Sequence, residues 1–416
     1  MRRPGRGEPL LRARVRRACR PSGFCVEGVE LELWPGEALV VAGRSGSGKT
    51  TLLRGLLGLP GVTLEGSVEV NAPAGYLPQE PWRAILGPTP RYDLELSGAP
   101  LNGFEEVLDK PVHWLSAGWK QRLALRSALH GASIAVLDEP GVYLDADARR
   151  ELRLLVEEML REGGAALIVD HDPHAWRGTA SKAVVLEEGR PLCSGSYEEC
   201  IAHYPQPPPP PRPRGRGMGG VLVSARGVWH RYPGSTWVLR GVCMEVYAGE
   251  VAAVTGPNGS GKTTLLKILA GVYRPTRGRV VAAAPATYIP ENPLLYYTGA
   301  TVYEEATWGG VDEAYAEEVL RRLGLWRLRD RPLAWLSTGE RRRAAIASAI
   351  THGYRVVAVD EPTAGLDPWA SNQVLSLLEE AASSGAAIIM ATHDERAAST
   401  ATTRYRLEGG VVARLP

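Results

Sequence analysis

One ordered series of glycine-rich and acidic motifs occurs twice in this chain of 416 residues. The first copy begins with GRSGSGKTT, from Gly43 to Thr51, and the second with GPNGSGKTT, from Gly256 to Thr264. Both fit G-x-x-x-x-G-K-[ST], a loop whose backbone N–H groups surround a phosphate. The two loop lysines lie 213 residues apart, and the acidic pairs that follow lie 222 residues apart. Two matched series in the same order predict a tandem duplication of a phosphate-binding unit.

The length agrees with this division, because two domains of about 200 residues can each bury a core. We expect a first domain over residues 1–204, a linker over 205–220 and a second domain over 221–416. With 44% hydrophobic residues, 23% charged residues and a net charge of +2, the chain is typical of globular proteins. This balance disfavours a disordered chain or a strongly nucleic-acid-seeking one. No apolar run approaches the roughly 20 residues that span a bilayer, so other chains would supply any membrane spans.

The linker is expected because periodicity stops at YPQPPPPPRPRGRGMGG, from Tyr204 to Gly220. Its five consecutive prolines, Pro207 to Pro211, predict a stiff polyproline spacer that rises about 3.1 Å per residue. Such a spacer could reach on the order of 40 Å. A ligand for an SH3-type domain is the alternative interpretation.

The arginine-rich start, MRRPGRGEPLLRARVRRACR, resembles a targeting peptide or a nucleic-acid arm only superficially. It has no apolar signal-peptide core, and Leu10–Arg14 align with Leu222–Arg226 of the second copy. We therefore expect an edge strand with solvated arginines. The five cysteines form no C-x-x-C pair, which favours reduced, intracellular thiols over a metal or iron–sulfur site.

Each copy predicts an α/β domain, because a β-branched strand, a glycine loop and a helix follow one another. EALVVAG precedes KTTLLRGLLG in the first copy, and EVAAVTG precedes KTTLLKILAG in the second. This order implies a parallel sheet with phosphates at a helix N-terminus. The candidate ATP-binding residues of the two loops are Gly43, Ser45, Gly46, Gly48, Lys49, Thr50 and Thr51, then Gly256, Asn258, Gly259, Gly261, Lys262, Thr263 and Thr264.

The acidic pairs supply the remaining chemistry of ATP hydrolysis. SIAVLDEP ends in Asp138 and Glu139, and RVVAVDEP in Asp360 and Glu361. The aspartates should hold Mg²⁺ and its water shell together with the hydroxyls of Thr50 and Thr263. The glutamates that follow are placed to polarise the attacking water. A solvated turn is the alternative for one such pair, but two pairs in register after phosphate loops favour catalysis.

LSAGWKQR, from Leu115 to Arg122, and LSTGERRR, from Leu336 to Arg343, lie between each loop and its acidic pair. They resemble the ABC signature, usually written LSGGQ. GVYLD and TAGLD, which end in Asp145 and Asp367, resemble D-loops, and His171 and His393 match the switch histidines. The chain is thus similar to a tandem pair of ABC ATPase domains. The resemblance implies two P-loop domains, each with a parallel-sheet core, a small antiparallel β part and a short helical subdomain.

In that family two domains pair head to tail, so that each ATP lies between one phosphate loop and the opposite signature. The resemblance implies one site with Lys49, Asp138, Glu139 and His171 together with Ser337 and Gly339. It implies another site with Lys262, Asp360, Glu361 and His393 together with Ser116 and Gly118. ATP would then join the two domains, and hydrolysis would release them.

The candidate sites of the two copies differ at the aromatic position and at the Q-loop position, and Trp119 and Glu340 replace the glutamine that usually ends the signature. Tyr232 stands where the family stacks an aromatic ring on adenine, whereas the first copy has Arg20 or Cys19. Gln79 matches the Q-loop glutamine, which in that family links the Mg²⁺ and catalytic water site to the transport partner, whereas the second copy has Glu291. A carboxylate can accept a proton or bind Mg²⁺, but it carries charge where an amide does not. We expect two hydrolytic sites of unequal rate.

The compact halves favour the motor subunit of an ABC importer, similar to the fused ATPases of energy-coupling-factor transporters for vitamins or metal ions. Its partners would be integral membrane subunits, docked on the short segments between Q-loop and signature, and no nucleic acid is expected. The protein would be peripheral to the cytoplasmic face of the cell membrane. The alternative is a soluble twin-ABC ATPase that acts on ribosomes or nucleic acid, which the absence of a cysteine-rich domain and of a long charged helical linker disfavours. The transported solute is not encoded in a motor domain.

Overall fold

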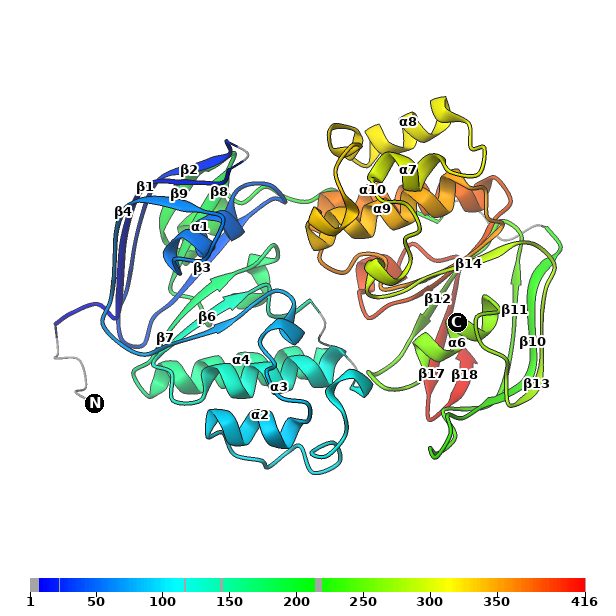
Figure 1. Cartoon of the computed structure of the whole chain (residues 1–416), viewed down its shortest axis with the longest axis horizontal. Helices are drawn as coiled ribbons and strands as arrows, with labels where there is room; N and C mark the ends of the chain where they lie inside the picture. The colour runs from blue at the N-terminus through cyan, green and yellow to red at the C-terminus, as the bar shows by residue number, and fades with distance from the viewer. Residues whose placement is uncertain are drawn as a thin grey trace. The chain divides into compact units, whose positions relative to one another are not determined.

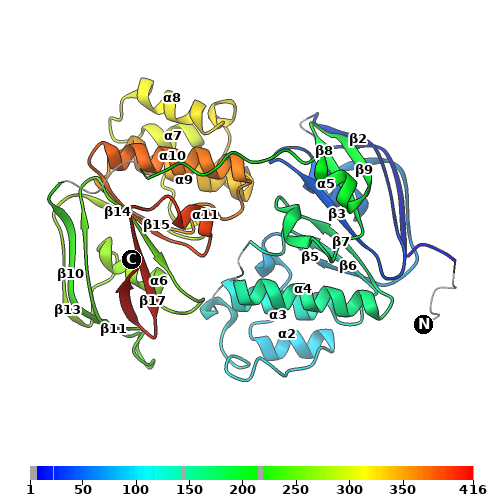
Figure 2. The ribbon, with the colours of Figure 1, turned by 180° about the vertical axis from the view of Figure 1, so that it is seen from behind.

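The structure is a computed structural model that describes residues 7–21, 23–115, 117–142, 144, 146–213 and 219–415. The chain divides into two compact units, Met1–Gln206 and Pro207–Pro416 (Figures 1 and 2). Each unit has its own sheets and its own apolar core.

In its described residues the first unit holds two sheets. A three-stranded antiparallel sheet has the order β2-β1-β4, and a six-stranded sheet has the order β5-β6-β7-β3-β8-β9. The first five strands of the larger sheet are parallel, and β9 pairs antiparallel with β8. The strands are β1 Leu11–Cys19, β2 Cys25–Leu33, β3 Ala38–Gly43, β4 Thr63–Val70, β5 Ala74–Leu77, β6 Ile134–Asp138, β7 Ala165–Val169, β8 Lys182–Glu187 and β9 Arg190–Ser196. The helices are α1 Lys49–Leu56, α2 Pro90–Ser97, α3 Ala117–Leu129, α4 Ala146–Arg161 and α5 Tyr197–Ala202, with short 3₁₀ turns at Pro81–Arg83, Val112–Trp114 and Pro173–Trp176.

The described part of the second unit repeats this arrangement. Its sheets have the orders β11-β10-β13 and β14-β15-β16-β12-β17-β18, which match the first unit strand for strand. The strands are β10 Val221–His230, β11 Leu239–Tyr247, β12 Val251–Thr255, β13 Arg277–Ala282, β14 Ala286–Ile289, β15 Val356–Asp360, β16 Ala387–Ala391, β17 Thr403–Glu408 and β18 Val411–Arg414. The helices are α6 Lys262–Leu269, α7 Val302–Thr307, α8 Glu313–Arg322, α9 Thr338–Thr351, α10 Pro368–Ser383 and α11 Glu395–Ala398, with 3₁₀ turns at Pro293–Leu295, Trp326–Leu328 and Leu333–Trp335. The predicted fold class, two α/β domains with small antiparallel sheets, is confirmed.

The central parallel strands are buried along their whole length. Every residue of β3, β6 and β7 is buried, and the same holds for β15 and β16. Such strands are continuous apolar runs because helices or a second sheet cover both faces. The loops at their carboxyl ends therefore have a rigid base.

The arginine-rich start of the chain forms an inner strand, which corrects the expectation of an edge strand. β1 lies between β2 and β4, and its alternate residues Leu11, Ala13 and Val15 point into the core. Two of its arginines pair across the ladder: Arg12 Nε lies 2.7 Å from a carboxylate oxygen of Glu32, and Arg17 Nε lies 3.0 Å from one of Glu27. Acidic β2 thus balances basic β1, which the sequence of β1 alone does not reveal.

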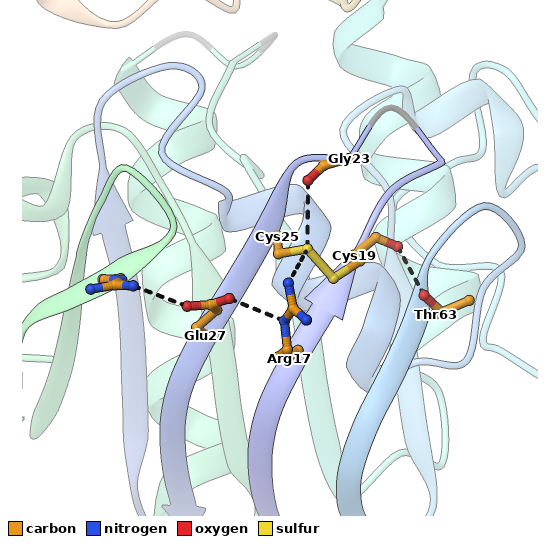
Figure 3. The surroundings of a disulfide bond; sticks show 7 residues. Arg17, Cys19, Gly23, Cys25, Glu27 and Thr63 are labelled. Atoms are coloured by element: carbon orange, nitrogen blue, oxygen red, sulfur yellow. Dashed lines mark hydrogen bonds and ion pairs between the residues drawn. A yellow bond between two sulfur atoms is a disulfide. The ribbon is translucent and has the colours of Figure 1, made fainter.

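Four of the five cysteines form disulfides, which corrects the expectation of reduced thiols. Cys19 and Cys25 are directly opposite each other at the end of the β1–β2 ladder, with Cα atoms 4.1 Å apart (Figure 3). Cys193 of β9 is bonded to Cys200 of α5, and Cys243 is free. Strand register and a strand-to-helix turn bring these pairs together, so no short cysteine motif marks them.

The polyproline segment is hydrogen-bonded to helices of the second unit. Asn372 of α10 donates from Nδ2 to the carbonyl oxygens of Pro208 and Pro209, at 3.0 and 2.8 Å. Arg396 of α11 donates to the same Pro208 carbonyl at 2.9 Å. On the other side of the linker, Tyr204 is buried in the first unit. Residues 214–218 lie outside the described part.

Candidate nucleotide sites

Each phosphate loop joins a buried strand to a helix, β3 to α1 and β12 to α6. Gly48 and Gly261 precede the helices with φ angles of 107° and 103°, which residues with a side chain rarely adopt. A Cβ atom at Gly48 would lie 2.4 Å from Val26 Cγ2. These positions require glycine, and the helix N-terminus that follows is a favourable place for a phosphate.

The loop lysines lie inside the curve of each loop. Lys49 Nζ donates to the carbonyl oxygens of Gly43 and Arg44, at 2.6 and 3.2 Å. Lys262 Nζ makes the matching bonds to Gly256 and Pro257, at 2.8 and 3.1 Å. Both side chains are buried, so a cation is fixed where the loop presents its N–H groups.

The aspartates that end β6 and β15 have the properties of cation ligands. Asp138 is buried, and its Oδ1 has no hydrogen-bond partner among the described residues. Burial, reinforced by the charge of Glu139, raises the pKa of Asp138 to about 7. Burial also raises the pKa of Asp360, whose Oδ2 accepts a 2.5 Å bond from Thr263 Oγ1. Two buried carboxylates, one of them bonded to a threonine hydroxyl, fit Mg²⁺, which would restore the charged form.

The glutamates that follow share an uncommon backbone conformation. Glu139 and Glu361 have φ angles of 48° and 51°, in the left-handed region. Each donates its N–H to the neighbouring strand at 2.8 Å, Glu139 to Val169 and Glu361 to Ala391. Left-handed conformations of residues with side chains concentrate at functional sites, because the surrounding structure must hold them. Both carboxylates are thereby fixed one residue beyond the candidate Mg²⁺ ligand.

The histidine contacts differ between the units. In the second unit His393 Nδ1 lies 2.8 Å from Glu361 Oε1, and Thr392 donates to Oε2 at 3.1 Å. In the first unit the distance from His171 Nδ1 to Glu139 Oε2 is 3.8 Å, too long for a hydrogen bond. Burial alone would raise the pKa of each glutamate, but the histidine, the loop lysine and the hydrogen bonds to the carboxylate together outweigh burial, and the net shift is downward. Both glutamates are therefore anionic and able to accept a proton.

The Q-loop positions also behave differently. Gln79 Nε2 donates to Glu139 Oε2 at 2.7 Å, so the first unit holds its catalytic candidate by an amide. Burial and the charge of Asp360 raise the pKa of Glu291 to about 7. A protonated carboxyl group can donate a hydrogen bond as an amide does. The charge difference expected between Gln79 and Glu291 is thus reduced by burial.

The sequence reasoning did not identify Arg342, which contacts the Q-loop backbone of the second unit. Arg342 is fully buried, and its guanidinium donates to the carbonyl oxygens of Pro290, Glu291 and Asp360. It ties the Q-loop to the end of β15. Gln121 occupies the same place in the first unit and donates to Pro140 O. The signal was present: each residue lies five positions after the signature serine, on the buried face of the signature helix.

The two units also differ at the position where the second unit has Tyr232. Tyr232 Oη lies 2.9 Å from Thr264 Oγ1, and its ring contacts that of His230 edge to face at 5.2 Å. In the first unit Thr51 Oγ1 is buried without a partner among the described residues. Cys19, one candidate for the matching position, is bonded to Cys25. An aromatic side chain is therefore present beside one phosphate loop, with a disulfide-closed hairpin beside the other, and the stacking of Tyr232 on adenine stays a prediction.

The signature of the second unit forms a helix cap. Ser337 Oγ accepts from Glu340 N at 3.3 Å, and the Glu340 carboxylate accepts from Ser337 N at 2.7 Å, which together form a capping box. A Cβ atom at Gly339 would lie 2.9 Å from Gly365 O, so the signature lies against the D-loop, whose Asp367 caps α10. In the first unit Gly118 is in the first turn of α3. Ser116 and Asp145 lie outside the described residues.

Comparison with known proteins agrees with this geometry. The sequence profile of the family described as ABC transporter matches residues 26–84 and 239–364. A provisionally named ABC transporter ATP-binding protein of Methanosarcina acetivorans is 28% identical, over 93% of this chain and 86% of its own length. One of Treponema denticola is 25% identical, over 93% and 92%.

Solved structures resemble the whole fold. The RNase-L inhibitor aligns with a TM-score of 0.68 at 24% identity, over 96% of this chain and 90% of its own. The structure of ribosome-bound archaeal Pelota and ABCE1 aligns with a TM-score of 0.75 at 25% identity, over 96% and 78%. Among the described residues no helix is both long and apolar enough to cross a bilayer. With its duplicated phosphate loops, acidic pairs and profile matches, the chain is a tandem ABC ATPase.

Proposed function

We propose that this ATPase is the motor subunit of an importer of the energy-coupling-factor type, peripheral to the cytoplasmic face of the cell membrane, where it takes up a vitamin or a metal ion with integral membrane subunits on other chains. The names of the relatives, which match over most of the chain, support a transporter.

The single observation that carries the proposal is the contact between Gln79 and Glu139, at 2.7 Å. It connects the catalytic candidate to the segment that follows the Q-loop. That segment exposes large apolar side chains: Leu86 is 76% exposed, and Leu295 in the second unit is 79% exposed. Exposed apolar groups beside a catalytic contact suit a partner whose docking changes the rate of hydrolysis.

Two composite sites would perform the reaction, each with the phosphate loop of one unit and the signature of the other. The first combines Lys49, Thr50, Asp138, Gln79, Glu139 and His171 with Ser337 and Gly339, and the second combines Lys262, Thr263, Asp360, Glu291, Glu361 and His393 with Ser116 and Gly118. Bound Mg²⁺ supplies charge neutralisation on the phosphates of ATP. The lysines bind the β- and γ-phosphates, and the glutamates accept the proton of the attacking water.

A second candidate function is a ribosome-associated twin ATPase. The alignment with ribosome-bound ABCE1 over 96% of this chain favours it, and it would contradict the expectation that no nucleic acid is bound.

The experiment is purification of the tagged chain from its native host, split into membrane and ribosome fractions, with bound proteins identified by mass spectrometry. The importer predicts multi-span membrane proteins that are lost in Leu86→Asp and Leu295→Asp, whereas Val411→Asp, an exposed position on an outer strand, retains them. Cosedimentation with ribosomes in place of membrane subunits would refute the importer and support the second candidate.

A further inference from the structure

The first unit has an apolar groove between α3 and α4, which run side by side in both views (Figures 1 and 2). Its volume is about 290 Å³. Leu125 of α3 and Leu152 and Leu155 of α4 form its walls, and Pro140 and Leu144 lie next to them on the segment that leads from β6 to α4. Leu155 is 37% exposed, so this surface is open to another molecule.

The matching surface of the second unit is covered by helix α8. Leu155 aligns with Leu377, which is 3% exposed, and Leu125 aligns with Ile346, which is fully buried. These residues share one core cluster with the buried face of α8, formed by Ala316, Val319 and Leu320. The difference in burial between the units therefore follows the presence of this helix.

Two polar contacts hold α8 in its place. Arg322 of α8 donates to Glu380 of α10 at 2.7 Å, and Arg343 of α9 donates to Leu323 O, at the C-terminal end of α8, at 2.5 Å. Both contacts have counterparts in the first unit, since Glu158 aligns with Glu380 and Arg122 with Arg343. A basic side chain and a helix C-terminus would thus find partners on the first unit.

In the part of the first unit that the structure describes, no helix occupies this place. Between α2 and the 3₁₀ turn at Val112–Trp114, residues 98–111 are described without any helix. Phe104 of this segment fills one end of the surface, where its ring centre lies 5.7 Å from that of Trp119. Gln121 lines the remaining groove, and its buried Oε1 has no partner among the described residues.

We propose that the groove between α3 and α4 binds an amphipathic helix of a partner protein, in the position that α8 occupies in the second unit. The helix has about three turns, a buried face of small and aliphatic side chains, and an arginine or lysine near its C-terminus that meets Glu158. Glu158 gives the charge complementarity. Arg122, which pairs with Glu151 at 2.9 Å, would exchange that pair for the last carbonyl oxygens of the helix. Pro140 lines the groove and directly follows Glu139, so a helix bound in the groove would lie next to the first catalytic site. The inference rests on comparison of the two units and not on the proposed function.

The test uses a fluorescein-labelled, hydrocarbon-stapled peptide with the sequence of residues 312–324 and the full-length protein. Three buried aliphatic side chains, less the cost of association, predict a Kd on the order of 10 to 100 μM by fluorescence anisotropy. Leu155→Asp should weaken binding at least about tenfold. Leu154→Asp is the matched control, because Leu154 is exposed on the same helix and does not line the groove. It should change the Kd by less than about twofold.

A charge-exchange experiment tests the orientation of the bound helix. Glu158→Arg should weaken binding of the unmodified peptide, and a peptide with Glu in place of Arg322 should bind that variant again. Absence of saturable binding up to 1 mM, equal loss in Leu154→Asp, or no recovery in the exchange would each overturn the proposal. If sedimentation shows that the protein dimerises and that Leu155→Asp abolishes the dimer, the occupant is a second copy and the partner helix is refuted.

Discussion

Arg342 carries a stability contribution that can be worked out from its contacts. The side chain is fully buried, and it satisfies the carbonyl oxygens of Pro290, Glu291 and Asp360. Arg342→Ala removes three charge-assisted hydrogen bonds and leaves these oxygens unpaired. We expect the free energy of unfolding of the second unit to fall by about 3 to 5 kcal/mol, in the lower part of the range for three buried carbonyl oxygens left without partners. For a unit of about 200 residues this corresponds to a Tm lower by about 6 to 20 °C.

The first unit supplies the control substitution. Arg342→Gln introduces the residue that stands at this position in the first unit, where Gln121 reaches one carbonyl oxygen. The loss should be about half of that in Arg342→Ala. Calorimetry gives the Tm, and hydrogen exchange followed by mass spectrometry assigns the transition to the second unit. A Tm lowered by less than about 3 °C in Arg342→Ala would show that the carbonyl oxygens find other partners and would refute the reasoning.

Three further predictions concern the glutamates and histidines of the sites and the neighbouring Asp170. Glu139→Gln and Glu361→Gln should each lower steady-state ATP turnover, and the double variant should lose at least about 100-fold; unchanged turnover in either single variant would contradict two hydrolytic sites. In the Glu139→Gln variant, which keeps the Glu361 site, His393→Ala should reduce turnover about tenfold or more. In the Glu361→Gln variant, which keeps the Glu139 site, His171→Ala should reduce turnover less, because only His393 lies within hydrogen-bond distance of its glutamate. A larger effect of His171→Ala would contradict this order. Burial raises the pKa of Asp170 above its unfolded value, so the folded state binds this proton more tightly and stability falls as pH rises from about 4 through the raised pKa. Asp170→Asn should flatten that dependence in chemical unfolding measured across this range, and an unchanged slope would show that Asp170 does not titrate there.

The sequence was sufficient to predict the parts whose chemistry dictates residue type. Gly48 and Lys49 could be placed because a phosphate loop needs both, and Glu139 because an apolar strand ends just before it. The fold class followed from the same alternation of strand, loop and helix. Local sequence and spacing determine these features, so no long-range contact had to be known.

What the sequence did not reveal depends on pairing between distant segments. The register of β1 and β2 brings Cys19 to Cys25, although no motif links them. The position of β1 between two strands depends on β4, about fifty residues later. The two units also differ in the side chain that contacts the glutamate. Gln79 bonds Glu139 in the first unit, and His393 bonds Glu361 in the second. The matching acidic and histidine motifs do not specify these side-chain distances.

The proline segment has a mechanical consequence. Tyr204 donates from its hydroxyl to the carbonyl oxygen of His171 at 2.7 Å, and Pro208 is held by Arg396, two residues after the Asp394 that caps α11. The linker is therefore hydrogen-bonded at Tyr204 to His171 and at Pro208 to Arg396, three residues after His393. Prolines lose little entropy when fixed, because their φ angle is already restricted. Only residues 205–207 lie between these two bonded positions, so the removal or insertion of a single residue there changes the length of the connection by one residue in three.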